Sequence, residues 1–258
     1  MPHKTASFHF FGSLSELLPA GKRGGAFAVA FQGEQSVKHL FESCGVPHTE
    51  VGEITANEAA VSPKYIVQDG DRIEIKSFNL PDLSGFQNPS GLEHVPPRFV
   101  LDIHLGRLAG WLRLLGFDAA YRNDLQDDEL AHISSQEGRA LLTRDRRLLM
   151  RSIVTQGCLV RSLLPQGQVE EVLTRYDLFS AIVPFGRCGR CNGLLEAVDK
   201  QQIIDQLQLL TKLYFDEFQR CTGCGQVYWK GSHTERFQEF VQELQKLGDR
   251  CPRLNRAH

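Results

Sequence analysis

Acidic residues recur between residues 98 and 151, each near the end of an apolar segment. An apolar run from Arg98 ends on Asp102, and a second run, Ala140–Thr143, is followed by Asp145. Three more carboxylates follow the segment between these runs: Asp124, Asp127 and Asp128. Ligands of parallel sheets bind at the carboxyl ends of the strands, so we expect these acidic residues to meet at one sheet edge.

Carboxylates that share a site repel one another, so such a site needs a compensating cation. Carboxylate and water oxygens suit Mg²⁺ or Mn²⁺. These ions polarise a phosphodiester, activate water and stabilise the leaving oxygen, which is the chemistry of a metal-dependent nuclease. A simpler interpretation stays open, because Asp and Glu also favour helix N-termini. On that interpretation Asp127, Asp128, Glu129 and Asp145 only cap helices.

The segments around these residues alternate between strand and helix patterns. Leu105, Leu108, Ala109 and Leu112 have helical spacing, and Gly116 ends that helix. Gly138 is expected to end the helix that begins at Asp127. The predicted strands are 98–103, 117–121, 140–143 and 158–160, and the predicted helices are 106–115, 127–137, 146–154 and the segment around 169–176. This β-α-β-α-β-α order predicts an α/β domain with a parallel sheet wrapped by helices.

Four of the seven cysteines form two CxxC pairs, and these are Cys188, Cys191, Cys221 and Cys224. Each pair forms a knuckle, and four thiolates suit a structural, tetrahedral Zn²⁺. A redox disulfide pair and an iron–sulfur cluster are the alternatives. An odd cysteine count with CxxC pairs favours a reducing compartment, so we expect a cytoplasmic protein. The insert 199–213 is predicted to be one helix, and a further helix is predicted from Glu235 onward.

Basic and aromatic residues suggest contacts with RNA. Between residues 98 and 185 every basic residue is Arg, which binds phosphate in a bidentate manner. Aromatic faces near the second knuckle could stack on bases. The candidates for RNA binding are Arg107, Arg113, Arg144, Arg146, Lys230, Trp229 and Arg236. A solvated helical face, and a small ribbon core holding Tyr228 and Trp229, explain the same residues without RNA.

The first 78 residues have the pattern of a separate small domain. Strands are predicted at 6–11, 27–31, 50–54, 59–61 and 72–78, with a helix that begins after Ser36. The order of two strands, a helix and then the remaining strands is that of a β-grasp fold. The Pro-rich segment 79–97 has no periodicity and is predicted to be a semi-rigid linker.

Two resemblances add to these patterns. The stretches FVLDIHLGRLAGWLRLLGFDAAYRND, DDEL and ALLTRDRRLL resemble the RNase family named for the C-terminal domain of the Mut-seven exonuclease. That resemblance runs from about Arg98 to the C-terminus. It implies a PIN-like nuclease domain with a zinc-binding tail and a Mg²⁺ or Mn²⁺ site made by Asp102, Asp124, Asp127, Asp128 and Asp145. His104 and Gly110 depart from the family pattern, and Gly110 removes an expected basic residue.

The N-terminal stretches GVPHTEVGEITAN and VQDGDRIEIKSF resemble ubiquitin-like sulfur carriers. Such carriers react through a free Gly-Gly terminus. Here the chain continues past residue 78 without one, so carrier chemistry is the least favoured function. A docking surface for a protein partner and a merely solubilising appendage stay open. The predicted modules are therefore 1–78 (β-grasp), 79–97 (linker), 98–185 (PIN-like) and 186–258 (zinc ribbon and helix).

Composition sets outer limits on function. The chain has 258 residues, 41% of them hydrophobic, but no apolar run long enough to span a membrane. It starts without the apolar core of a secretory signal. The net charge of −2 gives no global basic field. The leading hypothesis is a metal-dependent ribonuclease whose substrate is RNA of the tRNA or rRNA class. The rival is a non-catalytic RNA- or ribosome-binding adaptor whose acidic site is vestigial.

Overall fold

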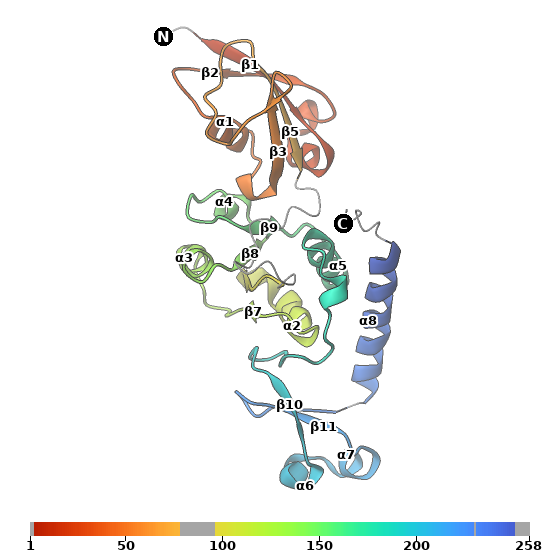
Figure 1. The fold of residues 1–258 in the computed structure, drawn as a ribbon. Coiled ribbons are helices and arrows are strands. Elements are labelled where there is room, and N and C mark those ends of the chain that lie inside the picture. Colours follow the sequence, from red (N-terminus) through yellow and green to blue (C-terminus); the bar gives the residue numbers. More distant parts are fainter. Residues whose placement is uncertain (1–2, 78–95, 230, 251–258) are drawn as a thin grey trace, which may run out of the picture. The chain divides into compact units, whose positions relative to one another are not determined.

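The chain divides into two units, each made from two separate stretches of sequence. A computed structural model (Figure 1) describes residues 3–77, 96–229 and 231–250. One unit combines Met1–Gly85 with Gln126–Leu159, and the other combines Phe86–Leu125 with Val160–His258. The predicted linker 79–97 lies almost wholly outside the described residues. In the part of the chain that is described, no helix has the length and apolarity that crossing a membrane requires.

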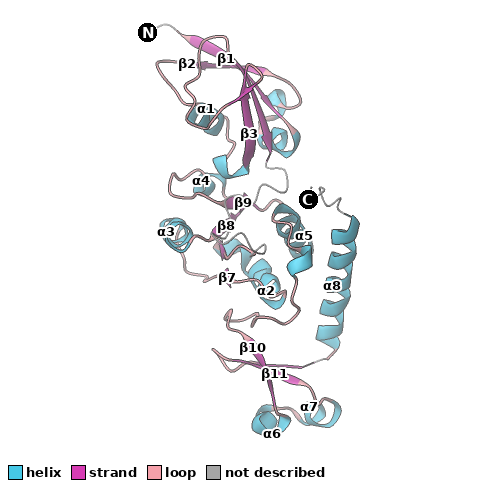
Figure 2. Ribbon diagram, in the orientation of Figure 1, coloured by secondary structure: helices cyan, strands magenta, loops and turns pink. Residues whose placement is uncertain are grey.

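The first unit contains a five-stranded mixed sheet, visible as arrows in Figure 2. Its strands lie in the order β2-β1-β5-β3-β4, with β1 and β5 parallel and the other pairs antiparallel. Their bounds are β1 Lys4–Phe10, β2 Phe27–Phe31, β3 Val51–Ala56, β4 Ala59–Ala60 and β5 Arg72–Ser77. This arrangement confirms the β-grasp prediction.

Helix α1, Val37–Ser43, packs its apolar side into the core of this sheet. The hydroxyl of Ser36 accepts the backbone N–H of His39 and so caps the helix, as the sequence predicted. Alternate residues of the strands are buried, including Phe8, Phe10, Ile73 and Ile75. Burial of these large side chains removes apolar surface from water and is the main source of the fold's stability.

The second stretch of this unit holds helix α3, strand β8, helix α4 and strand β9. Their bounds are α3 Asp127–Glu137, β8 Ala140–Thr143, α4 Arg146–Leu149 and β9 Gly157–Leu159, and β8 pairs with β9 in parallel. Gly138 ends α3 with a φ of +61°, as its type predicted. Helix α4 is shorter than the predicted 146–154. After Leu149 the backbone N–H groups bond three residues back, and these turns bring Val154 into the core.

The second unit contains strands β6 (Phe99–Leu101) and β7 (Ala119–Ala120), which pair with each other in parallel. Helix α2, Gly106–Leu114, connects them and packs against α5, Pro165–Arg175. Gly116 ends α2 with a φ of +98°, and a Cβ atom there would lie 2.9 Å from the carbonyl oxygen of Val183. The parallel α/β pattern of the prediction is thus confirmed in both units.

Three antiparallel strands and a long helix complete this unit. The strands are β10 Leu195–Val198, β11 Phe218–Cys221 and β12 Val227–Trp229, and the helix is α8 Ser232–Arg250. Trp111 of α2 lies against α8, with its ring centroid 4.6 Å from that of Phe240. The insert forms two short helices, α6 Lys200–Ile203 and α7 Leu209–Tyr214, so the prediction of one helix is wrong. Ile203 and Leu207 both enter the small ribbon core, and Leu207 reaches it in an extended conformation.

Candidate active site and metal centre

Four cysteines come together between the strands of the ribbon. Their Sγ atoms all lie within 4.8 Å of one another. The separations are 3.3 Å for Cys191–Cys221 and 3.6 Å for Cys188–Cys224. A tetrahedral zinc with Zn–S bonds of about 2.3 Å needs sulfurs roughly 3.8 Å apart. The donor set and its spacing therefore fit a closed four-thiolate metal site of the structural type.

Backbone donors prepare one of these thiols for metal binding. The N–H groups of Gly223 and Cys224 both lie 3.4 Å from Sγ of Cys221 and donate to it. Burial alone would raise the pKa of this thiol, but these donors and Cys191 outweigh burial and hold the pKa at about 6. The thiolate that a metal needs is thus the favoured form of Cys221 at neutral pH.

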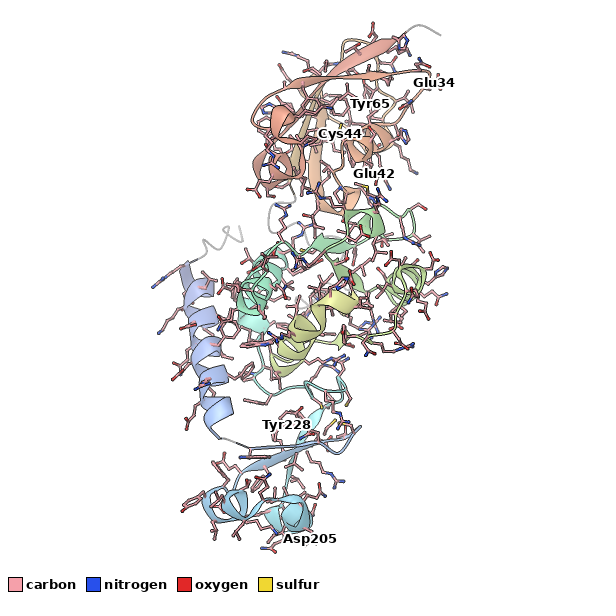
Figure 3. All side chains as sticks on the ribbon, turned by 180° about the vertical axis from the view of Figure 1, so that it is seen from behind. Glu34, Glu42, Cys44, Tyr65, Asp205 and Tyr228 are labelled. Carbon is pink, nitrogen blue, oxygen red and sulfur yellow. The ribbon has the colours of Figure 1, made fainter. Side chains whose placement is uncertain are left out.

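Tyr228 supports the first knuckle from strand β12 (Figure 3). Its hydroxyl lies 3.2 Å from Sγ of Cys188 and accepts the backbone N–H of Gly189 at 3.1 Å. Burial would raise the pKa of the Cys188 thiol, but the Tyr228 hydroxyl and nearby backbone N–H groups lower it further than burial raises it. Two roles were expected for Tyr228 from the sequence, which are base stacking and packing in the ribbon core. The structure instead places its hydroxyl beside a metal ligand.

Arg113 holds the other side of the same knuckle. Its side chain belongs to α2, is 5% exposed, and donates to the carbonyl oxygens of Gly189 (3.2 Å) and Arg190 (2.9 Å). Its Nε donates to the carbonyl oxygen of Ala119 at 2.8 Å. Burial lowers the pKa of this guanidinium, while Cys191 and Cys188 raise it. The expected RNA contact does not fit this burial, because the guanidinium is already bonded to backbone carbonyls.

Asn192 links the knuckle to strand β7 and was not identified from the sequence. Its Oδ1 accepts the N–H of Ala119 at 3.1 Å, and its Nδ2 donates to Asp118 at 2.8 Å. Its φ of +72° is a conformation that Asn tolerates better than most residues. Asn directly after the CxxC pair was the available signal. With Arg113, it joins the ribbon firmly to the α2–β7 segment.

Two of the predicted acidic residues belong to the second unit. Asp102 follows β6, is 6% exposed, and accepts the backbone N–H of His104 at 3.3 Å. Asp124 is exposed in the turn after β7 and forms a two-point ion pair with Arg122, at 2.9 and 3.0 Å. This hydrogen bond lowers the pKa of Asp124. Asp102 is therefore held at the carboxyl end of its strand, as the sequence predicted.

The other three belong to the first unit. Asp145 lies two residues after Thr143, the last residue of β8, and is exposed. Its carboxylate accepts the N–H of Arg147 at 2.7 Å and so caps α4. Asp127 and Asp128 lie in the first turn of α3, where Asp128 is paired with Arg151. The Arg151 hydrogen bond lowers the pKa of Asp128. Asp145 therefore caps α4, and metal binding by its carboxylate stays a prediction. Convergence of all five carboxylates stays a prediction.

The remaining candidates for RNA contact have varied surroundings. Arg107 and Arg144 are exposed, whereas Arg146 donates to the carbonyl oxygen of Leu17 at 2.7 Å. Trp229 is 38% exposed and Arg236 is exposed. Lys230 lies outside the described residues.

Fold and site together define an α/β protein that carries a ubiquitin-like β-grasp module and a four-cysteine metal ribbon. A model of the Mut7-C RNAse domain matches residues 97–241, and a model of the Mut7-C ubiquitin domain matches residues 3–79. The first match covers more than half of the chain, so the chain belongs to the Mut7-C RNAse domain family. A search of curated proteins and a search of solved structures found no match.

Proposed function

We propose that this protein is a metal-dependent ribonuclease that cuts RNA endonucleolytically. The observation that carries the proposal is the match of residues 97–241 to an RNase domain. The acidic motif positions within that match supply the ligands for Mg²⁺ or Mn²⁺, and they are Asp102, Asp124, Asp127, Asp128 and Asp145. The bound ion would activate water and stabilise charge on the phosphodiester.

The chain's own residues would bind and orient the RNA around that ion. Arg107 and Arg144 are exposed and can hold phosphate oxygens through their guanidinium groups. Trp229 and Arg236 would contribute stacking and phosphate contacts from the ribbon side. Arg122 and Arg151 lower the pKa values of Asp124 and Asp128, so these carboxylates stay ionised to a lower pH.

The second candidate is a non-catalytic RNA- or ribosome-binding adaptor. It is favoured by the same ion pairs, because Arg122 and Arg151 satisfy carboxylates that a catalytic ion would need. In this function the zinc ribbon and the exposed arginines would bind RNA, and the β-grasp domain would bind a protein partner. Substrate classes to test first are tRNA and rRNA.

Cleavage of a labelled tRNA and rRNA pool separates the two candidates. Wild type and the Asp102→Asn/Asp145→Asn double variant are compared with Mn²⁺ present or omitted. Omission is preferable to EDTA, because EDTA also competes for zinc. Asp205→Asn, an exposed carboxylate of the ribbon insert, is the matched control.

The ribonuclease proposal expects Mn²⁺-dependent cleavage by wild type and Asp205→Asn, with loss of at least about a hundredfold in the double variant. Equal background in all proteins, with RNA still bound, would establish the adaptor instead. RNA binding is followed in parallel by fluorescence anisotropy.

A further inference from the structure

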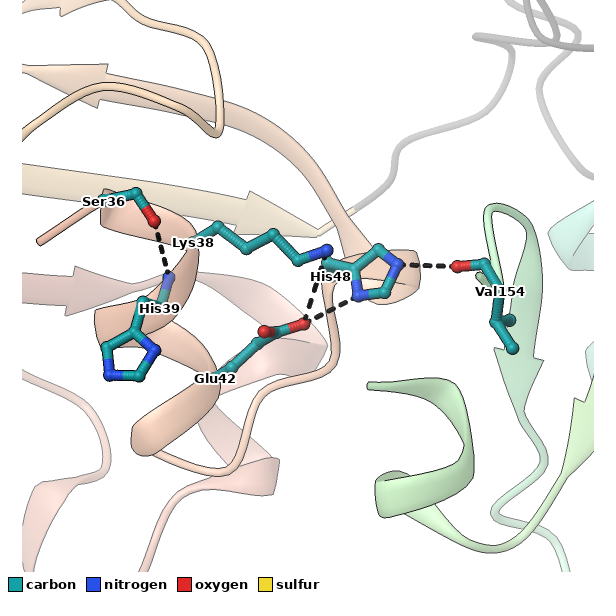
Figure 4. Close-up of polar contacts among 6 residues, drawn as sticks. All are labelled: Ser36, Lys38, His39, Glu42, His48 and Val154. Atoms are coloured by element: carbon teal, nitrogen blue, oxygen red, sulfur yellow. Dashed lines mark hydrogen bonds and ion pairs between the residues drawn. The ribbon is translucent and has the colours of Figure 1, made fainter. Parts of the chain in front are cut away.

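Three polar contacts join the ubiquitin-like domain to the segment Arg146–Leu159. The backbone N–H of Leu159 donates to Glu50 Oε1 at 2.8 Å, and Arg146 Nη1 donates to the carbonyl oxygen of Leu17 at 2.7 Å. Between them, Nε2 of His48 lies 2.7 Å from the carbonyl oxygen of Val154 (Figure 4). The contacts reach the start of α4, the loop after it and the end of β9. They therefore bracket the whole segment.

Glu50 makes the most demanding of these contacts. It lies in a short 3-10 helix, His48–Glu50, and is only 8% exposed. A carboxylate with so little access to water is costly unless hydrogen bonds compensate it. The N–H of Leu159 supplies one such bond in buried surroundings. Loss of the Glu50 carboxylate would therefore leave the buried N–H of Leu159 without this acceptor, which costs free energy.

His48 is held in a fixed orientation from both sides. Its side chain is 15% exposed, and its Nδ1 lies 2.7 Å from Glu42 Oε1. A carbonyl oxygen can only accept, so Nε2 of His48 donates to Val154. Glu42 also lies 3.9 Å from the ammonium of Lys38, so the carboxylate that orients the imidazole is itself fixed (Figure 4). The loop before β9 is therefore attached to a preorganised donor.

Asp145, one of the predicted metal ligands, directly precedes the bracketed segment. Asp145 caps α4, and Arg146 is the first residue of that helix. A helix of a single turn has little stability of its own. Its position therefore depends on tertiary contacts. Strands β8 and β9 supply some of them, and the ubiquitin-like domain adds the hydrogen bonds to Arg146, Val154 and Leu159.

We propose that the ubiquitin-like domain positions the Asp145 helix, and so is a fixed part of the nuclease and not a tethered recognition module. This inference rests on the proposed function for its catalytic consequence only. Glu50 and His48 act as positioning residues, because they contact the segment that carries Asp145 and not the RNA. If the domain were attached through the linker alone, substitution of Glu50 would not change the hydrogen exchange of residues 140–159.

Hydrogen exchange of the full-length protein tests the contact directly. Glu50→Ala removes the acceptor and Glu50→Gln retains an oxygen that can accept. Glu53→Ala, at an exposed position of strand β3, is the matched control. We expect exchange of Leu159 and its neighbours in 140–159 to rise about tenfold in Glu50→Ala. Glu50→Gln should restore most of the protection, and Glu53→Ala should match wild type. Unchanged exchange in Glu50→Ala would overturn the inference.

The catalytic consequence is measured on the same proteins. Glu50→Ala should lower kcat for Mn²⁺-dependent cleavage with little change in KM, and Glu50→Gln should recover it. Faster exchange with an unaltered kcat would overturn the positioning role. If wild type does not cleave RNA, the proposed function fails, and the exchange experiment still decides whether the domain holds the segment. Should Glu50→Ala lose the β-grasp fold, His48→Ala replaces it because it removes the donor to Val154, with protection of β1 and β5 as the check on folding.

Discussion

Replacement of Arg113 by Met should destabilise the protein through the zinc knuckle. Met keeps much of the aliphatic volume but removes every donor. The carbonyl oxygens of Ala119 and Arg190, which accept at 2.8 and 2.9 Å, would then lack their charged partner. A hydrogen bond from a charged group contributes about 1.5–3 kcal/mol, so these two bonds account for roughly 3–6 kcal/mol.

The net loss should be smaller, because burying the guanidinium has its own cost. That cost is visible in the lowered pKa of Arg113, for which burial is the largest cause. We therefore expect a loss of about 2–4 kcal/mol, or a Tm lowered by roughly 4–16 °C for a chain of this size. The Tm of Arg113→Lys should lie between those of wild type and Arg113→Met, because one ammonium group cannot bond to all the carbonyl oxygens that the planar guanidinium reaches.

Thermal unfolding followed by circular dichroism measures the effect, and zinc release to a chromogenic chelator reports on the knuckle. Arg107→Met, on the exposed side of the same helix, is the control and should stay within about 0.5 kcal/mol of wild type. If Arg113→Met unfolds at the wild-type temperature and retains zinc equally, the carbonyl contacts do not stabilise the knuckle and the reasoning is refuted.

Three further outcomes are expected. Tyr228→Phe should weaken zinc binding about 10- to 100-fold in a chelator competition without changing the far-ultraviolet spectrum, since only the hydroxyl near the ligand is lost. Cys191→Ser, or removal of zinc, should unfold the ribbon and lower Tm; an unchanged Tm would show that the four thiolates are not a structural site. Arg151→Gln should raise the pKa of Asp128 toward the ordinary value of about 4, as read from an NMR titration. The pair stabilises the fold above that pH, and its contribution is lost as pH falls through the lowered pKa.

Local signals in the sequence predicted most elements well. Ser36 marked the start of α1, Gly138 the end of α3, and the 140–143 run the whole of β8. These signals depend on backbone conformation and on side-chain spacing within one segment. The prediction of one helix in the insert 199–213 failed. The spacing of its apolar residues fitted a helix, whereas Leu207 enters the ribbon core in an extended conformation.

The candidate site was only partly predictable, because its supporting contacts are distant in sequence. The four cysteines could be identified from their spacing, but Arg113 bonds to carbonyl oxygens of residues 76 and 77 positions away in the sequence. Nothing near Arg113 in the chain distinguishes it from an exposed arginine. Glu50 likewise has a partner 109 residues away, so its role depends on the folded structure.

The split composition of the first unit has a consequence for synthesis of the chain. Glu50 leaves the ribosome 109 residues ahead of Leu159, its hydrogen-bond partner. At about 5–20 residues per second, the ubiquitin-like sheet waits roughly 5–20 seconds before the second half of its unit arrives. During that interval the Glu50 carboxylate stays hydrated, and the groups that later bond to residues 146–159 are exposed to solvent. The order of translation thus means that the N-terminal domain is synthesised before the Asp145 segment that it contacts.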